Sequence, residues 1–186
     1  ASDVYKRQGP DSQTQEGNGV KSHGALRVEG ASLCDENGNP VVLRGMSSHG
    51  ISWYPRYLNG GAMKTLKEYG ANLFRIAAYT EPSGAYLENP DRTLDYLYMG
   101  AESALAEDLY VILDWHILND SDPNEHIEEA KDFFDQLSAH YADEPGILYE
   151  ICNEPNGDVT WEQISAYAEE VIPVIRKNAP DAVILV

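Results

Sequence analysis

Apolar residues along the chain follow two alternating patterns. Short runs of β-branched, aliphatic and aromatic residues, typical of strands, occur at 41–46, 72–79, 110–116, 147–153 and 182–186. Between these runs, apolar residues recur every three or four positions, as in helices that bury one face. Regular alternation of strand and helix predicts right-handed parallel βαβ units.

Two of the predicted helices have recognisable start signals. Asp122 and Thr160 are residues that cap helices, and each is followed three positions later by an acid or an amide. The apolar positions that follow have helical spacing: Ile127, Ala130, Phe134, Leu137 and Tyr141, then Ile164, Ala168, Val171 and Ile175. Pro173 lies inside the last helix and is expected to kink it.

The first part of the chain has a different composition from the rest. Residues 1–24 are rich in Gln, Gly, Ser and Asp and have few apolar side chains, so we expect a disordered linker or a cloning or assembly scar. The folded domain is expected at 25–186. It begins with a small β-hairpin turning at Gly30, followed by a second turn cluster at 35–40.

The predicted elements amount to five strands and four complete helices. A (β/α)8 barrel needs about 250 residues, so the sequence predicts an α/β protein that contains the first half of a TIM barrel, truncated after about strand five. A doubly wound nucleotide-binding fold also alternates strands and helices, but it needs a glycine-rich phosphate loop after its first strand. The segment 45–50 lacks the G-x-G-x-x-G spacing.

The net charge of the chain makes some classes of binding partner unfavourable. Lys and Arg number 13 against 31 Asp and Glu, for a net charge of -18, which repels nucleic acid and anionic membrane surfaces. A neutral ligand such as a polysaccharide is not repelled. The two cysteines, Cys34 and Cys152, provide no disulfide framework, and no apolar run approaches the roughly 18 residues that cross a bilayer.

Polar residues gather at the predicted carboxyl ends of the strands, where barrel active sites form. Side chains alternate along a strand, so Arg75 and Tyr79 should face the barrel interior, as should His116. The same count on the fourth strand turns Glu150, Cys152 and Glu154 inward. The alternate positions are apolar, as a helix-covered face requires.

These residue types suit glycoside hydrolysis, which uses one carboxylic acid and a second carboxylate. Glu154 could be the acid, Asn153 could bind a sugar hydroxyl, and Arg75 could keep a neighbouring carboxylate ionised. Trp53 and Tyr79 could stack on pyranose rings. Each residue also has a purely structural explanation: Glu154 could begin a loop, His116 could be a packed histidine, and Trp53 could cap the barrel. Asp120 and Asp122 are better explained as turn and cap residues than as calcium ligands.

Four segments, 43–50, 74–77, 113–116 and 149–157, together resemble glycoside hydrolase family 5, most closely its bacterial endoglucanases. The resemblance implies a retaining endo-β-1,4-glucanase, or cellulase, on a (β/α)8 barrel. It implies that Glu154 is the acid/base, beside Asn153, and that Arg75 and His116 belong to the active-site shell. The positions that match the glucose-binding cleft are His49, Trp53 and Tyr79.

The resemblance also implies a secreted monomer that acts on β-1,4-linked glucan polysaccharide or oligosaccharide, with no metal and no cofactor. Cys152 stands where a small residue such as Ala is usual. The family's nucleophilic Glu and its later sugar-binding residues have no counterpart before Val186, so we expect the chain alone to be inactive. A mannanase or xyloglucanase on the same fold and a non-catalytic sugar-binding fragment are the alternatives.

Overall fold

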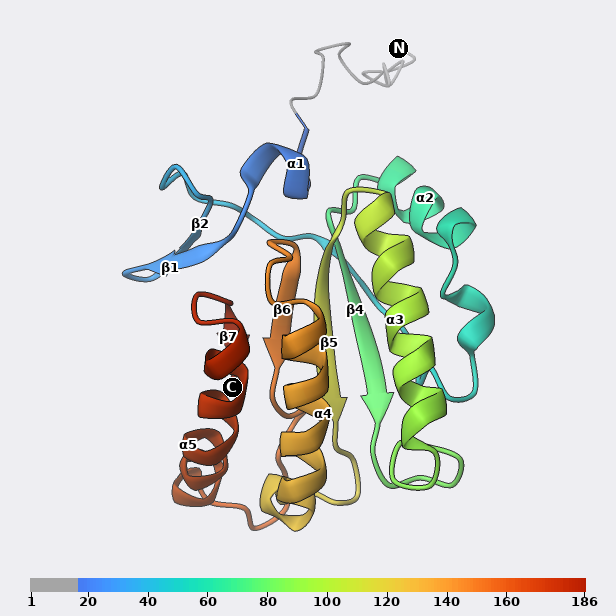
Figure 1. Ribbon diagram of the computed structural model, residues 1–186, viewed down its shortest axis with the longest axis vertical. Coiled ribbons are helices and arrows are strands. Elements are labelled where there is room, and N and C mark those ends of the chain that lie inside the picture. Colours follow the sequence, from blue (N-terminus) through green and yellow to red (C-terminus); the bar gives the residue numbers. More distant parts are fainter. Residues whose placement is uncertain (1–16) are drawn as a thin grey trace, which may run out of the picture.

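A parallel five-stranded sheet forms the centre of the structure, a computed structural model that describes residues 17–186 (Figure 1). The strands are β3 (Gly45–Ser47), β4 (Leu73–Tyr79), β5 (Tyr110–His116), β6 (Ile147–Glu150) and β7 (Ile184–Leu185). They lie side by side in chain order. A doubly wound sheet reverses its strand order at a switch point, whereas this sheet does not, as a barrel requires.

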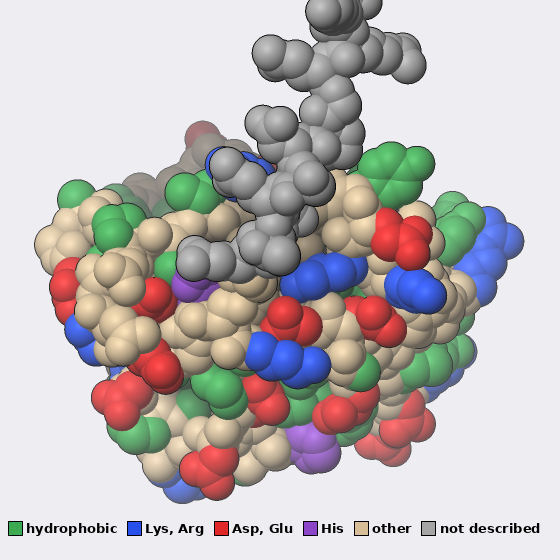
Figure 2. Space-filling model, turned by 90° about the horizontal axis from the view of Figure 1, so that it is seen from above, with side chains coloured by type: hydrophobic (Ala, Val, Ile, Leu, Met, Phe, Trp, Pro, Cys, Tyr) green, Lys and Arg blue, Asp and Glu red, His purple; other side chains and the backbone are tan. Residues whose placement is uncertain are grey.

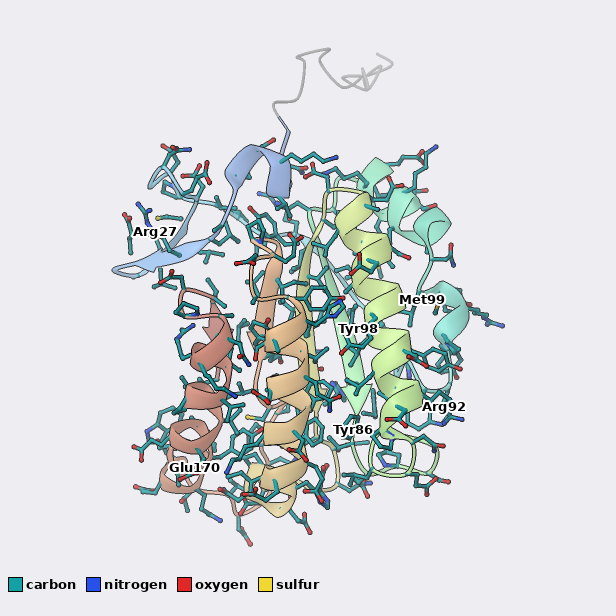
Figure 3. All side chains as sticks on the ribbon, viewed as in Figure 1. Arg27, Tyr86, Arg92, Tyr98, Met99 and Glu170 are labelled. Atoms are coloured by element: carbon teal, nitrogen blue, oxygen red, sulfur yellow. The ribbon has the colours of Figure 1, made fainter. Side chains whose placement is uncertain are left out.

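Helices cover one face of the sheet. In chain order they are α2 (Gly60–Glu68), α3 (Pro90–Ala106), α4 (Ile127–His140) and α5 (Trp161–Asn178), and α3, α4 and α5 lie in front of the strands in Figure 1. Tyr86 lies between α3 and α4 (Figure 3). Its ring meets those of Trp115 and Phe133 edge-on, with centroids 5.1 and 5.3 Å apart. This apolar layer fixes the outer face of the sheet and turns the polar residues to the other side.

The predicted helix starts are found with one difference. Thr160 begins α5 in a reciprocal capping box, because its side chain accepts from the Gln163 N–H at 3.3 Å and the Gln163 side chain accepts from the Thr160 N–H at 2.9 Å. Asp122 caps a 3-10 turn, η2 (Pro123–His126), and the α-helix starts only at Ile127. Helix α5 continues through Pro173 to Asn178.

A second apolar cluster fills the inner face of the sheet near the amino ends of the strands. Its buried members are Leu26, Val41, Tyr110, Ile112 and Leu148. The predicted hairpin, β1 (Arg27–Glu29) paired antiparallel with β2 (Ser32–Cys34), follows Leu26 at this end. Packing at one end of the interior leaves the opposite, carboxyl end for polar groups.

Some residues before the expected boundary at residue 25 pack against the domain. Helix α1 (Val20–His23) and Asn18 contact the amino ends of the strands: the Asn72 side chain donates to the Asn18 carbonyl at 3.0 Å, and the Tyr110 hydroxyl donates to the Gly24 carbonyl at 2.7 Å. Residues 1–16 of the expected linker lie outside the described residues. At this end of the molecule, acidic and basic side chains are interspersed around the apolar ones (Figure 2).

Strands β3, β6 and β7 are each three residues shorter than the apolar runs that predicted them, and β4 is one residue shorter. Residues 41–44 precede β3 without joining it, because the Asn72 side chain bonds the Val42 carbonyl and the Arg44 N–H at 3.0 and 2.7 Å. Strand β6 ends at Glu150, three residues before the expected end. Cys152 then lies in the same apolar cluster as its neighbour Ile151, so the predicted alternation fails beyond Glu150. Strand β7 is limited to two residues.

None of the helices within residues 17–186 has both the length and the apolar character needed to cross a membrane.

Candidate active site

Arg75, on β4, joins the polar residues at the carboxyl edge of the sheet. Its Nε and Nη2 donate to the two carboxylate oxygens of Glu150 on β6 at 2.6 and 2.7 Å. The same Nη2 lies 2.9 Å from Asp114 Oδ2 and 3.0 Å from Asn153 Oδ1. Nη1 donates to the Ser47 hydroxyl on β3 at 3.1 Å. One guanidinium therefore ties four consecutive strands together, and the inward orientation predicted for Arg75 is confirmed.

The pKa of Arg75 shows which effect dominates here. Burial alone would lower the pKa, but the hydrogen bonds that Arg75 donates to Glu150 and the negative charges of Asp114, Glu150 and Glu154 outweigh burial and raise it. The guanidinium is thus held firmly in its charged form. Since Arg75 faces three carboxylates, this edge of the sheet remains electronegative.

Asp114 is fully buried, and although it lies in the segment 113–116 noted in the sequence, it was not among the seven predicted site residues. Its Oδ2 lies 2.6 Å from His116 Nδ1 as well as 2.9 Å from Arg75, while no residue within 17–186 forms a hydrogen bond with its Oδ1. Burial raises the pKa of Asp114 to about 6, against the opposing effects of the His116 hydrogen bond and the Arg75 charge. The signal was in the sequence, because Asp114 is two positions before His116 and so shares its face.

His116 ends β5 with its ring fixed from two sides. When Asp114 is ionised it can only accept, so Nδ1 carries the hydrogen of their 2.6 Å contact and Nε2 is left for a ligand. The Tyr79 ring lies against the imidazole with centroids 4.1 Å apart. His116 is 9% exposed, so only a small part of its ring reaches solvent.

Asn153 and Glu154 follow β6 but differ in environment. Asn153 is buried, and besides accepting from Arg75 it donates to the Ile117 carbonyl at 3.1 Å. Glu154 is exposed and has a positive φ of 39°, a left-handed conformation that is uncommon for residues other than glycine. The Asn156 side chain donates to the Glu154 carbonyl at 3.0 Å and to the Leu118 carbonyl at 3.2 Å. These bonds brace the strained turn that carries the carboxylate.

Three aromatic side chains, those of His49, Trp53 and Tyr79, lie together next to this polar network; they are called the aromatic group below. The ring of Tyr79 lies nearly parallel to that of His49, with centroids 5.9 Å apart, and meets Trp53 edge-on at 5.3 Å. The Trp53 indole N–H donates to the Ser83 carbonyl at 3.2 Å. Gly50 makes this packing possible, because a Cβ at this position would lie 2.3 Å from the Trp53 ring.

The structure connects six of the seven residues selected from the sequence by direct contacts, and Glu154 follows Asn153 directly in the chain, where its charge acts on Arg75. Arg75, His116 and Asn153 share one hydrogen-bonded network with Asp114 and Glu150, and the aromatic group reaches that network through the Tyr79–His116 contact. Asp120 accepts from Leu118 N at 2.6 Å and from the Thr80 hydroxyl at 2.5 Å, as a turn residue does. Residues 17–186 contain no group of three or more His, Cys, Asp or Glu side chains arranged for a metal ion.

Parallel strands in sequential order, with a polar network at their carboxyl ends and helices outside, define a protein of the (β/α)-barrel enzyme class. The family model "Cellulase (glycosyl hydrolase family 5)" matches residues 34–186. The chain belongs to this family. The expected fold class and family are both confirmed.

Named relatives agree with this assignment. The chain is 46% identical over 172 residues to Endoglucanase A of Butyrivibrio fibrisolvens. The aligned region covers 90% of this chain and 40% of that protein. It is 46% identical over 180 residues to Endoglucanase E-5 of Thermobifida fusca, covering 95% and 38%. The chain thus spans about two fifths of the length of these curated relatives.

Solved structures give the same result. The catalytic domain of Thermobifida fusca endoglucanase Cel5A (E5) superposes with a TM-score of 0.86 at 44% identity, over 90% of this chain and 55% of that one. A variant of that domain was solved in complex with cellotetraose. Cellulase Cel5C_n superposes with a TM-score of 0.87 at 44% identity, over 91% and 55%.

Proposed function

We propose that residues 25–186 are the first half of the catalytic domain of a retaining endo-β-1,4-glucanase, with Glu154 as its general acid/base. The observation that carries the proposal is the position of Glu154, exposed at the carboxyl edge of the sheet and next to the buried network of Asn153 and Arg75. A carboxyl group that must reach a glycosidic oxygen has to be exposed, while the groups that position it can be buried.

In this reaction the Glu154 carboxyl first donates its proton to the glycosidic oxygen as the bond from that oxygen to the anomeric carbon breaks. A second carboxylate attacks the anomeric carbon and forms a glycosyl-enzyme ester. Glu154, now ionised, removes a proton from water, whose oxygen displaces the ester and regenerates both groups.

The attacking carboxylate is proposed to come from a segment outside residues 1–186. It must lie about 5 Å from the acid/base carboxyl group, across the scissile bond, and be free to attack. Glu150 is held by both its oxygens on Arg75, and Asp114 is fully buried. Neither can approach a sugar, so both are assigned to positioning Arg75 and His116.

The other residues are proposed to bind the substrate. Asn153 uses one amide hydrogen for the Ile117 carbonyl, which leaves the second for a sugar hydroxyl, and His116 offers its Nε2. The aromatic rings of Trp53 and Tyr79, with His49, would stack on the glucose units. These groups suit a neutral polymer. Because such a polymer is too large to enter a cell, we propose that the enzyme is secreted. A monomer is proposed from the family resemblance alone, and the proposed reaction assigns no step to a metal or a cofactor.

The test is hydrolysis of carboxymethylcellulose by the complete enzyme that contains this chain. Glu154→Gln should lower kcat by about 10²- to 10⁴-fold, the usual contribution of general acid–base catalysis. Glu162→Gln, which removes a carboxylate from an exposed position in the first turn of α5, is the matched control and should retain full activity. Equal activity of the two variants would refute the role of Glu154.

Three further measurements test the missing nucleophile and the alternative functions. Purified residues 1–186 should not release reducing sugar, and turnover by them would refute a nucleophile outside this segment. Calorimetric binding of cello-oligosaccharide without cleavage by the complete protein would favour a sugar-binding fragment instead. A panel of glucan, mannan, xyloglucan and xylan should give the highest kcat/KM on glucan, whereas a preference for mannan or xyloglucan would identify a different enzyme on this fold.

A further inference from the structure

The side chain that supports the Glu154 turn belongs to a chemically reactive pair of residues. Asn156 donates through Nδ2 to the Glu154 carbonyl at 3.0 Å and to the Leu118 carbonyl at 3.2 Å. The next residue is Gly157, and both residues are exposed and lie outside helices and strands. The amide that holds the turn is therefore also the first half of an exposed Asn-Gly pair.

An Asn-Gly pair can lose ammonia in water without an enzyme. The glycine nitrogen gives up its proton and attacks the asparagine Cγ, so that a bond forms between nitrogen and Cγ while the bond from Cγ to Nδ2 breaks. Nδ2 leaves as ammonia, which carries the lost proton. Water then opens the cyclic imide at either carbonyl carbon and leaves aspartate or isoaspartate. Glycine favours this attack because it has no side chain and few limits on its backbone angles.

The Gly157 nitrogen is available for this attack. Nothing within residues 17–186 accepts a hydrogen bond from its N–H. The surroundings are open, because a Cβ at Gly157 would meet only the Ser121 hydroxyl, at 3.8 Å. Asn156 is restrained through Nδ2 alone, and Nδ2 is the atom that leaves.

The other Asn-Gly pairs of the chain begin at Asn18, Asn37 and Asn59. Asn59 is the cap of α2 and is held through both atoms of its amide: Oδ1 accepts from the Ala62 N–H at 3.1 Å and Nδ2 donates to the Arg56 carbonyl at 2.7 Å. Asn18 Oδ1 accepts from the charged Lys67 Nζ at 3.2 Å, and a charged donor gives the stronger hydrogen bond. Both amides are therefore fixed against rotation towards the glycine nitrogen.

The pair at Asn37 is restrained at its other half. The Gly38 N–H donates to the Asp35 carbonyl at 3.0 Å. This nitrogen must give up a hydrogen bond before it can lose its proton and attack. Of the four pairs, the one at Asn156 is thus the pair whose nitrogen is free and whose amide oxygen is unrestrained.

Deamidation of Asn156 would reverse its effect on the turn. A carboxylate accepts hydrogen bonds and has none to donate, so the Glu154 and Leu118 carbonyls would lose their donor and face a negative charge. The left-handed backbone of Glu154, with a φ of 39°, would then lose its support. A negative charge two residues away also disfavours the ionised form of the Glu154 carboxyl group and so raises its pKa.

We propose that Asn156 is a site of spontaneous deamidation, and that its conversion to aspartate or isoaspartate disables the turn that carries Glu154. The effect on hydrolysis rests on the proposed function, whereas the chemical change at Asn156 does not. The change is faster in alkaline solution, because the attacking nitrogen must first lose its proton.

The experiment incubates the complete enzyme in mildly alkaline buffer and follows each Asn-Gly peptide by mass spectrometry. The peptide that contains Asn156 should gain the mass of deamidation faster than those that contain Asn18, Asn37 and Asn59, and carboxymethylcellulose hydrolysis should be lost at the same rate. Gly157→Asn is the control. Asparagine tolerates the φ of 69° found at this position, but its side chain hinders the attack, so modification and inactivation should both slow by the same factor.

Two variants separate the lost hydrogen bonds from the new charge. Asn156→Asp should lower kcat by about tenfold, the value of one hydrogen bond. It should also move the alkaline limb of the pH–rate profile to higher pH, because Glu154 acts as an acid in its protonated form and keeps its proton longer. Asn156→Ala loses the same bonds without the charge, so it should lower kcat and leave the alkaline limb in place.

Deamidation of Asn156 no faster than that of the other three pairs would overturn the site. Full activity of Asn156→Asp, or inactivation of Gly157→Asn at the wild-type rate, would overturn its effect on the turn. If the wild-type enzyme hydrolyses no glucan, the proposed function fails on its own. Mass spectrometry then still decides the site, and thermal unfolding decides the support of the turn: a lower midpoint in Asn156→Asp than in the wild type supports it, and equal midpoints refute it.

Discussion

Arg75 on β4 and Glu150 on β6 form a two-point ion pair across the intervening strand β5, at 2.6 and 2.7 Å. Asp114, on β5, lies between them and contacts the same guanidinium at 2.9 Å. Planar guanidinium and carboxylate groups joined by two bonds have one favourable geometry. The pair therefore fixes the relative height of three strands as well as the position of Arg75.

This arrangement predicts a stability cost for Glu150→Gln. The Gln side chain offers Arg75 one acceptor oxygen where Glu150 offers two, and it carries no negative charge. The free energy of unfolding should therefore fall by about 1–3 kcal/mol in urea denaturation. The pair of Arg27 and Glu29 is the control, because it has the same 2.6 Å contact with side chains 51% and 48% exposed. Glu29→Gln should cost less than about 0.5 kcal/mol. Equal losses would contradict the structural role of Glu150.

Asp114 predicts a pH dependence of stability. Its pKa of about 6 in the folded protein is above the usual 3.8, so its protonated form favours folding. This contribution is complete below about pH 3.8 and is lost as the pH rises through about 6. The stability of the wild type relative to Asp114→Asn should therefore fall by about 1–3 kcal/mol between pH 4 and pH 7. A rise over that range would mean that the ionised form, paired with Arg75 and His116, is the preferred one.

Gly50 predicts a defect in ligand binding. In Gly50→Ala the new methyl group would lie 2.3 Å from the Trp53 ring and 2.9 Å from that of Tyr79, so both rings must move. We expect cellotetraose affinity to fall about tenfold through the lost contacts, with a shift in tryptophan fluorescence. Gly60→Ala, at a position with no atom within 4 Å of the new Cβ, should change neither signal. Unaltered binding in Gly50→Ala would show that Trp53 does not hold the sugar.

The backbone of Glu154 predicts that stability and activity change in opposite directions. Glycine adopts positive φ without a steric penalty, so Glu154→Gly should raise the free energy of unfolding by about 0.5–1 kcal/mol and abolish hydrolysis. Glu154→Ala removes the same carboxylate but keeps a Cβ at a φ of 39°, and should show the loss of activity without the gain. Thermal unfolding of both variants distinguishes strain from charge. A gain of equal size in Glu154→Ala would assign it to charge.

The strands whose environment is uniform were the ones predicted best. The apolar run at 110–116 matches β5 to the residue, because every residue in it is buried between two neighbouring strands. The run at 41–46 overestimated β3, since a side chain, that of Asn72, takes the hydrogen bonds of Val42 and Arg44 that a neighbouring strand would otherwise make. Such a substitution depends on a residue about 30 positions away and leaves no periodic signal.

The residues selected from the sequence lie near one another in the structure, while their roles in a site stay predictions; the contacts between them were not predicted. Alternation placed Arg75 and His116 on one face correctly, and the same count applied to Asp114 would have found it. Side-chain alternation could not predict that β6 ends at Glu150. It also could not predict the positive φ of Glu154, which the Asn156 side chain supports by bonding the Glu154 and Leu118 carbonyls. Local strain of this kind is created by tertiary contacts. Reading the sequence alone therefore overextends strands near a site.

The amino-terminal segment lies at the amino end of the sheet, the upper end in Figure 1, and this has a practical consequence. Val20 and its neighbours lie at the amino ends of the strands, and the network around Arg75 lies at their carboxyl ends. A surface or carrier protein coupled near Val20 would leave the polar carboxyl edge of the sheet facing the bulk solution. Immobilisation through this end is accordingly the orientation that keeps the candidate site open to a large ligand.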